Sequence, residues 1–158
     1  MNKIKEKFEV EENAEITIEV NPGTINKEKL EAYREAGFNR ISIGLQAAQN
    51  EILKPIGRIH TYEEFESCYK LAKEAGFENI NVDLMLGLPK QSLDDLKDSL
   101  NNIINLNPNH ISLYSLILEE NTPLEKEVSQ GLYVLPSDEE ERKMYDTTKK
   151  ILEKNGYI

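Results

Sequence analysis

The feature that most constrains this chain is a short repeat that joins the end of a helix to the start of a strand. Glu35-Ala36-Gly37-Phe38 precedes an alternating apolar segment at 40–46, and Glu74-Ala75-Gly76-Phe77 precedes a similar segment at 79–86. Glycine is typical of helix ends because it adopts the left-handed backbone conformation at low cost. Each copy therefore predicts a helix, a tight turn and a strand.

A third copy begins at Glu153-Lys154-Asn155-Gly156, and the sequence ends at Ile158. The repeat predicts a strand after Gly156, so we expect the chain to be truncated at this point. A truncated domain leaves apolar surface uncovered. Self-association of the chain is therefore a second expectation.

Strands are expected at about 15–20, 40–46, 79–86 and 110–118, with helices between them. Helix starts are indicated by Thr61 with Glu64, by Ser137 with Glu140, and by Ser92 followed by two aspartates. Strands that alternate with helices form a parallel sheet with helical crossovers. The predicted fold class is α/β, a partial TIM-like (β/α) barrel of about four parallel strands with outer helices. Residues 119–136 show no strong periodicity and are expected to form a long connection.

Each expected strand alternates apolar and polar residues, which is unusual for a parallel sheet covered on both faces. Ile41, Ile43 and Leu45 oppose Ser42, Gly44 and Gln46, and the strands at 15–20 and 79–86 follow the same pattern. The apolar face must pack against helices. The polar face must meet water or a polar ligand, because burial of an unpaired carboxylate is costly.

Composition excludes several classes of function. The formal net charge of -10 argues against nucleic acid as a partner, because binding a polyphosphate requires a basic face. The sequence has no apolar run long enough to span a membrane, and its start lacks the apolar segment of a secretory signal. The single cysteine, Cys68, excludes an internal disulfide and a cysteine-ligated cluster, and it falls on an apolar helical stripe. We expect a cytoplasmic protein.

Glu19, Gln46 and Asp83 share the polar face, and each lies near the carboxyl end of its strand. Ligand sites of β/α barrels gather at this end. Two carboxylates and an amide there would accept hydrogen bonds from ribose hydroxyls or an ammonium group. Arg58, after the permissive Gly57, would hold a carboxylate by a two-pronged contact.

The alternative is that these side chains are solvated residues on a half-exposed sheet, and that Arg58 only adds solubility. His60 is equally consistent with a helix-entry residue and with a ligand. No second metal-binding residue pairs with it, so no metal site is expected in this chain. No catalytic residue is assigned either.

Five ordered motifs resemble the coproporphyrinogen III oxidase-like family of radical S-adenosylmethionine (SAM) proteins. The resemblance covers nearly the whole chain and lies nearest the heme chaperone branch of that family. The motifs are Glu15 to Thr24 (EITIEVNPGT), Ser42 to Gln46 (SIGLQ), Gly57 to Thr61 (GRIHT), Asn81 to Pro89 (NVDLMLGLP) and Asn107 to Ser112 (NPNHIS).

The resemblance implies that Glu19, Gln46, Arg58 and Asp83 contact SAM. It also implies a [4Fe–4S] cluster, whose CxxxCxxC motif and whose adjoining glycine-rich strand would lie upstream of Met1, and a further C-terminal domain. Residues 1–158 would then be the central part of a radical SAM barrel domain. Without the cluster no electron reaches the sulfonium of SAM. We therefore expect this chain alone to be inactive.

Two activities follow for the parent protein, both in porphyrin or heme metabolism. One is reductive SAM cleavage coupled to oxidation of coproporphyrinogen, and the other is heme binding and delivery without that decarboxylation. An unrelated barrel hydrolase or lyase is a third hypothesis, which the order of the motifs disfavours.

Overall fold

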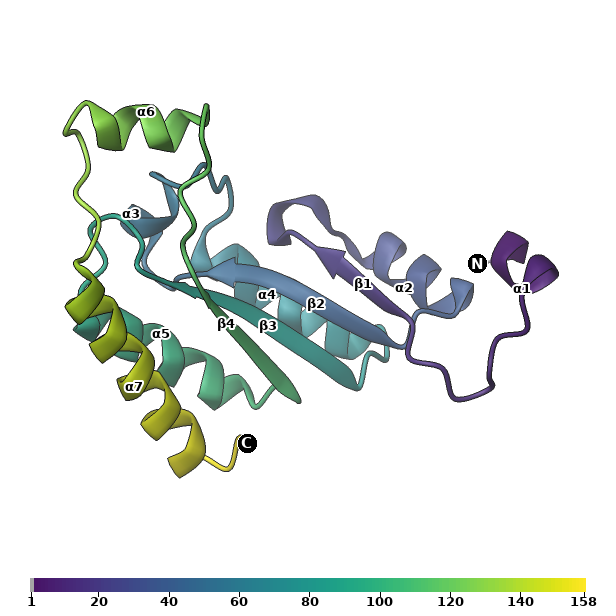
Figure 1. Ribbon diagram of the computed structural model, residues 1–158. Coiled ribbons are helices and arrows are strands. Elements are labelled where there is room, and N and C mark those ends of the chain that lie inside the picture. Colours follow the sequence, from purple (N-terminus) through teal and green to yellow (C-terminus); the bar gives the residue numbers. More distant parts are fainter. Residues whose placement is uncertain (1) are drawn as a thin grey trace.

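A computed structural model describes residues 2–158 of the chain (Figure 1). Its helices and strands are, in order, α1 Asn2–Lys7, β1 Thr17–Val20, η1 Pro22–Thr24 (a 3₁₀ turn), α2 Lys27–Ala36, β2 Arg40–Gln46, α3 Asn50–Leu53, α4 Tyr62–Glu74, β3 Asn79–Leu86, α5 Leu93–Leu106, β4 His110–Ser115, α6 Pro123–Ser129 and α7 Asp138–Lys154.

The four strands form one sheet in the order β1-β2-β3-β4, and every neighbouring pair is parallel. Sequence order is therefore also spatial order, as expected for successive strand–helix–strand units. This confirms the predicted fold class, an arc of four parallel strands from a β/α barrel.

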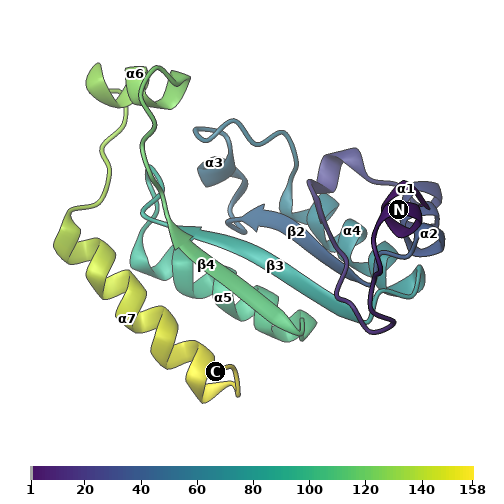
Figure 2. The same ribbon diagram turned by 45° about the vertical axis from the view of Figure 1, so that its right-hand side comes forward.

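Helices cover one face of this arc. In Figures 1 and 2, α2, α4, α5 and α7 lie along the same side of the sheet, and α5 packs against α7. The core between the layers contains fully buried side chains from the strands and from α4 and α5. These are Ile41, Ile43, Leu45, Ile80, Val82, Leu84, Phe65, Leu96, Leu100 and Ile103. The side chains predicted to face the helices do so, and Cys68 is buried among them.

Local sequence signals fix the helix ends. The side chains of Thr61, Ser92 and Ser137 each accept a hydrogen bond from the backbone N–H three residues later. The acidic side chain at that later position accepts one from the backbone N–H of the capping residue. Each pair satisfies two backbone donors that the helix leaves free. Gly37 ends α2 at a φ of 99°, in the left-handed region that the repeat predicts.

Residues 119–136 connect β4 to α7 as expected, but this connection also contains a short helix, α6, which the sequence analysis did not predict. Thr122 caps this helix and Pro123 occupies its first position, yet none of its side chains is buried. A helix of seven residues without a buried stripe gives no periodic signal, so its composition resembles that of a loop. The last strand is also shorter than expected. It ends at Ser115, although Leu116 still donates a backbone hydrogen bond to Leu86.

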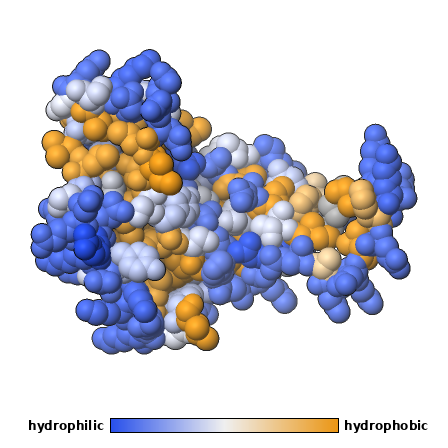
Figure 3. Space-filling model, viewed as in Figure 1, coloured by the Kyte–Doolittle hydropathy of each residue, from blue (hydrophilic) through white to orange (hydrophobic). Residues whose placement is uncertain are grey.

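Apolar side chains emerge beside α6, where Figure 3 shows a hydrophobic patch. Ile117, Leu132 and Val134 are 74%, 65% and 81% exposed. Such exposure agrees with the expected self-association, which stays a prediction. Within residues 2–158, no helix combines the length and the hydropathy needed to cross a bilayer.

Candidate functional site

The uncovered face of the sheet carries the residues predicted to form a site. Glu19 is in register with Ser42, and Asp83 is in register with Gly44, so the side chains of Glu19, Ser42 and Asp83 project from the same face. Gln46 ends β2 with a φ of 75°, next to an irregularity in the pairing with β3. Glu19, Gln46 and Asp83 therefore come from three adjacent strands, toward their carboxyl ends.

Asp83 is held by neighbours on the same face. Ser42 Oγ donates to Asp83 Oδ2 and Asn81 Nδ2 donates to Asp83 Oδ1, each at 2.8 Å. Ser112 on β4 donates to Asn81 Oδ1 at 3.1 Å. The polar face was expected to meet water or a ligand, whereas Ser42 and Asn81 are buried and bind each other. Their mutual hydrogen bonds remove the cost of that burial and fix the carboxylate.

Gln46 contacts a residue that sequence reasoning missed. The hydroxyl of Tyr114, on β4, donates to Gln46 Oε1 at 3.1 Å. Gln46 is only 2% exposed, whereas Tyr114 is 44% exposed. The polar-face alternation of β4 (His110, Ser112, Tyr114) is the only sequence signal that would have placed this tyrosine in the site.

Arg58 reaches the site through a turn. The short helix α3 is followed by Gly57 at a φ of 71°, and Arg58 N then donates to the Leu53 carbonyl at 3.1 Å. The Arg58 side chain donates from Nη1 to Asn21 Oδ1 at 2.6 Å, just beyond β1. Arg58 is therefore brought to the carboxyl end of the sheet and aimed by Asn21.

His60 ties this turn to β2. Its ring is 4% exposed, and its Nε2–H donates to the carbonyl of Leu45 at 3.2 Å. Burial lowers the pKa of His60 below its ordinary value, and the nearby Arg58 charge lowers it further. The Leu45 carbonyl and Glu64 act in the opposite direction. His60 therefore links the turn that carries Arg58 to the residue that precedes Gln46.

Charges of both signs surround Tyr114. Burial raises the pKa of its hydroxyl; Asp83 and Glu19 add to this, and the Gln46 hydrogen bond and Arg58 oppose it. Tyr114 is therefore neutral and a donor at physiological pH. Among the residues that the structure describes, Glu19, Arg58 and Asp83 form no ion pair. The site thus offers a ligand two carboxylates and one guanidinium that no described residue neutralises in an ion pair.

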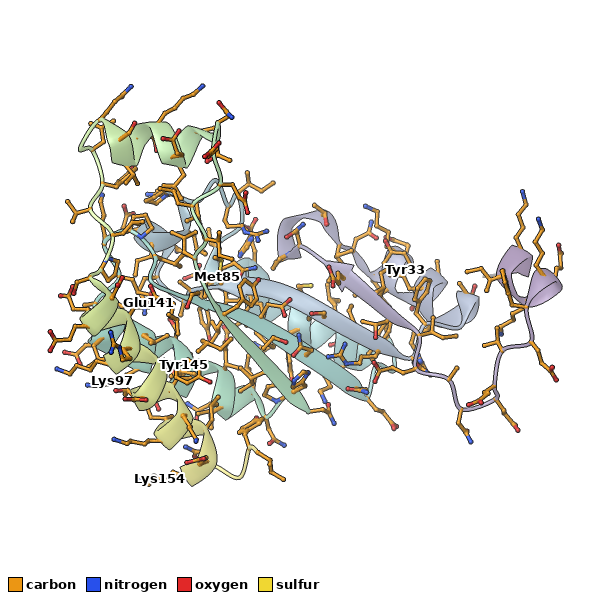
Figure 4. All side chains as sticks on the ribbon, in the orientation of Figure 1. Tyr33, Met85, Lys97, Glu141, Tyr145 and Lys154 are labelled. Atoms are coloured by element: carbon orange, nitrogen blue, oxygen red, sulfur yellow. The ribbon has the colours of Figure 1, made fainter. Side chains whose placement is uncertain are left out.

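A groove adjoins these residues. It encloses about 560 Å³ and is lined by Arg58, Met85, Ile117, the 54–57 turn and part of α6. This volume falls in the usual range for small-molecule sites. Figure 4 shows Met85 toward the end of the sheet nearest α6, apart from Tyr33 and from Lys154 on α7. The groove therefore places an apolar wall, which includes Met85 and Ile117, beside the polar face of the sheet.

An iron–sulfur cluster does not fit the residues of this chain. The sequence has one cysteine, Cys68, which is buried, and burial raises the pKa of its thiol to about 11. Across residues 2–158, no group of three His, Cys, Asp or Glu side chains converges as metal ligands would. No reaction step through a cluster is derived for this chain.

Comparison with known proteins identifies the family of the chain. The model of the Radical SAM superfamily matches residues 1–103. The heme chaperone HemW of Lactococcus lactis is 39% identical over 154 residues, which cover 98% of this chain and 41% of that relative. The oxygen-independent coproporphyrinogen III oxidase of Synechocystis is 33% identical over 158 residues, which cover 99% of this chain and 34% of the oxidase.

A solved structure shows the same fold. The coproporphyrinogen III oxidase HemN of Escherichia coli, described as a radical SAM enzyme, superposes with a TM-score of 0.83 and 30% identity. The match covers 99% of this chain and 36% of that one. The resemblance inferred from the five motifs is confirmed, and the chain spans about two-fifths of the first HemW relative.

We expect His60 to make stability depend on pH. Because the folded pKa is depressed, the unfolded chain binds more protons, and stability is lost as pH falls below about 6.5. Between pH 7.5 and 5.5, the urea midpoint of the wild type should fall further than that of His60→Gln. Equal falls in the two proteins would show that His60 is not buried in its neutral form.

Proposed function

The chain belongs to the Radical SAM superfamily, and from this premise we propose that the carboxyl end of its sheet binds S-adenosylmethionine. Arg58 would hold the methionine carboxylate, and Glu19 and Asp83 would accept hydrogen bonds from the ammonium or ribose hydroxyls. Gln46 would contribute its amide. The observation that carries the proposal is geometric. Glu19, Gln46 and Asp83 lie toward the carboxyl ends of three adjacent strands, and Arg58 is hydrogen-bonded to Asn21 just beyond the first of these strands.

Charge supports this ligand. SAM carries a sulfonium, an ammonium and a carboxylate, so its net charge is +1. The site carries two carboxylates and one guanidinium, a formal charge of −1, and no ion pair within the described chain neutralises them. Complementary charge favours the encounter and orients the ligand.

One of the two carboxylates is already fixed in position. Asp83 is fixed by Ser42 and Asn81, so little side-chain entropy is lost when a ligand hydroxyl or ammonium binds it. The adjoining groove gives an apolar wall that includes Met85 and Ile117. A polar end next to an apolar wall suits a nucleoside joined to an amino acid.

For the whole protein we favour a radical SAM protein of porphyrin or heme metabolism. Reductive cleavage of SAM, with oxidation of coproporphyrinogen, is one candidate activity, supported by the oxidases of Synechocystis and E. coli. Heme binding and delivery is the other, and the higher identity to a heme chaperone favours it. Reductive cleavage of SAM requires a cluster, and the single cysteine of this chain cannot ligate one, so the chain alone is expected to bind SAM without cleaving it.

We expect weak but localised SAM binding. Each charge-assisted contact contributes ~1–3 kcal/mol in a formed site and less on an exposed arc, which implies millimolar affinity. In ¹H–¹⁵N NMR spectra, millimolar SAM should shift the backbone amides of Glu19, Gln46, Arg58 and Asp83. Arg58→Gln should weaken the response several-fold.

The matched control is Arg142→Gln, which makes the same change of charge on the exposed face of α7. It should leave the titration unchanged. Shifts centred on α7 or on the amino ends of the strands, or an Arg58→Gln response equal to that of the wild type, would refute the proposed site.

The two whole-protein activities are separable by experiment. After anaerobic reconstitution of its cluster, the whole protein is assayed for heme binding and for conversion of coproporphyrinogen. We expect stoichiometric heme binding without turnover of coproporphyrinogen. Turnover without heme binding would favour the oxidase.

A further inference from the structure

The carboxamide of Gln46 is constrained at both of its ends. Its oxygen accepts a hydrogen bond from the Tyr114 hydroxyl at 3.1 Å. Its nitrogen lies against Gly44, where a Cβ atom would come within 3.0 Å of Nε2. Because Gly44 has no side chain, the amide nitrogen of Gln46 fits beside it. The hydrogen bond from Tyr114 to the amide oxygen determines that the nitrogen, and not the oxygen, faces Gly44.

The two contacts come from different strands. Tyr114 lies on β4, and its hydroxyl reaches across β3 to the end of β2. Gln46 adopts a φ of 75°, and its side chain lies beside Gly44, the residue two positions earlier in the strand. A non-glycine residue in this conformation requires support from its surroundings.

We propose that Tyr114 is a positioning residue that orients Gln46 so that its NH₂ group donates to an acceptor oxygen of the bound ligand. This inference rests on the proposed function and specifies the role of one residue in it. It also differs from the sequence expectation, in which Gln46 was an acceptor. The amide oxygen is already engaged by Tyr114, whereas Nε2 remains a donor.

The location of Arg58 supports a donor role for Gln46. A Cβ atom placed on Gly44 would lie 3.6 Å from Asn21 Oδ1. This same oxygen accepts a hydrogen bond from Arg58 Nη1 at 2.6 Å. Gln46 Nε2 and the Arg58 guanidinium thus lie on the same side of the site, and both carry N–H groups. The acceptors Asp83 and Glu19 complete the polar face. A ligand with an acceptor oxygen at one end and donors at the other fits this division.

A first test uses the chain without ligand. Removing the hydroxyl in Tyr114→Phe should move the side-chain amide ¹⁵N and ¹H signals of Gln46, because the hydrogen bond to its oxygen is lost. Tyr145→Phe is the matched control, since Tyr145 is exposed on α7 (Figure 4). Gln46 signals that stay in place in Tyr114→Phe, in a chain that keeps its dispersed backbone spectrum, would overturn the proposal.

A second test separates donor from acceptor. Gln46→Glu keeps an oxygen for Tyr114 but has no N–H to give, and it adds a negative charge that attracts SAM. If Gln46 donates, this variant should still bind SAM roughly three- to tenfold more weakly than the wild type. Binding as strong as the wild type would show that Gln46 acts as an acceptor, which overturns the proposal.

A second ligand shows whether the oxygen that accepts from Gln46 belongs to the ribose or to the carboxylate of SAM. 5′-Methylthioadenosine has the ribose of SAM but no carboxylate. A Gln46→Glu defect that persists with it assigns the oxygen to ribose, and a defect confined to SAM assigns it to the carboxylate. If neither ligand shifts any wild-type signal, the proposed function fails, whereas the ligand-free Gln46 signals still decide the role of Tyr114.

Discussion

The parallel register between β2 and β3 is the constraint on which the rest of this structure depends. It aligns Ile41, Ile43 and the other apolar residues of β2 with those of β3, and it aligns Gly44 with Asp83. Because side chains alternate with a period of two, a slip of one residue would turn the apolar set to the open face and the polar set into the helices. One pairing therefore determines both the core and the site.

The site is arranged before a ligand arrives. Asp83, Gln46 and Arg58 are each held by a second side chain, namely Ser42 (with Asn81), Tyr114 and Asn21. His60 joins the Arg58 turn to the end of β2. Buried polar groups are stabilising only when their hydrogen bonds are satisfied, and here the supporting residues satisfy one another. Ligand binding then requires little rearrangement of these side chains.

Sequence predicted those parts of the molecule whose causes are local. The capping pairs, the left-handed Gly37 and the alternation in β2 and β3 each depend on a few neighbouring residues, and the structure confirms them. The supporting partners were not predicted, because Tyr114 and Gln46 are 68 residues apart and only the fold brings them together. The helix α6 was missed since no buried stripe marks it.

The most direct test of SAM binding at the carboxyl end of the sheet is an isotope-filtered NOE experiment with SAM labelled by ¹³C in its methyl group. Binding as described predicts contacts from SAM protons to the Tyr114 ring and to the methyl group of Met85, which lines the adjoining groove. Contacts only to residues at the amino ends of the strands, such as Asn39 and Asn79, would contradict the account.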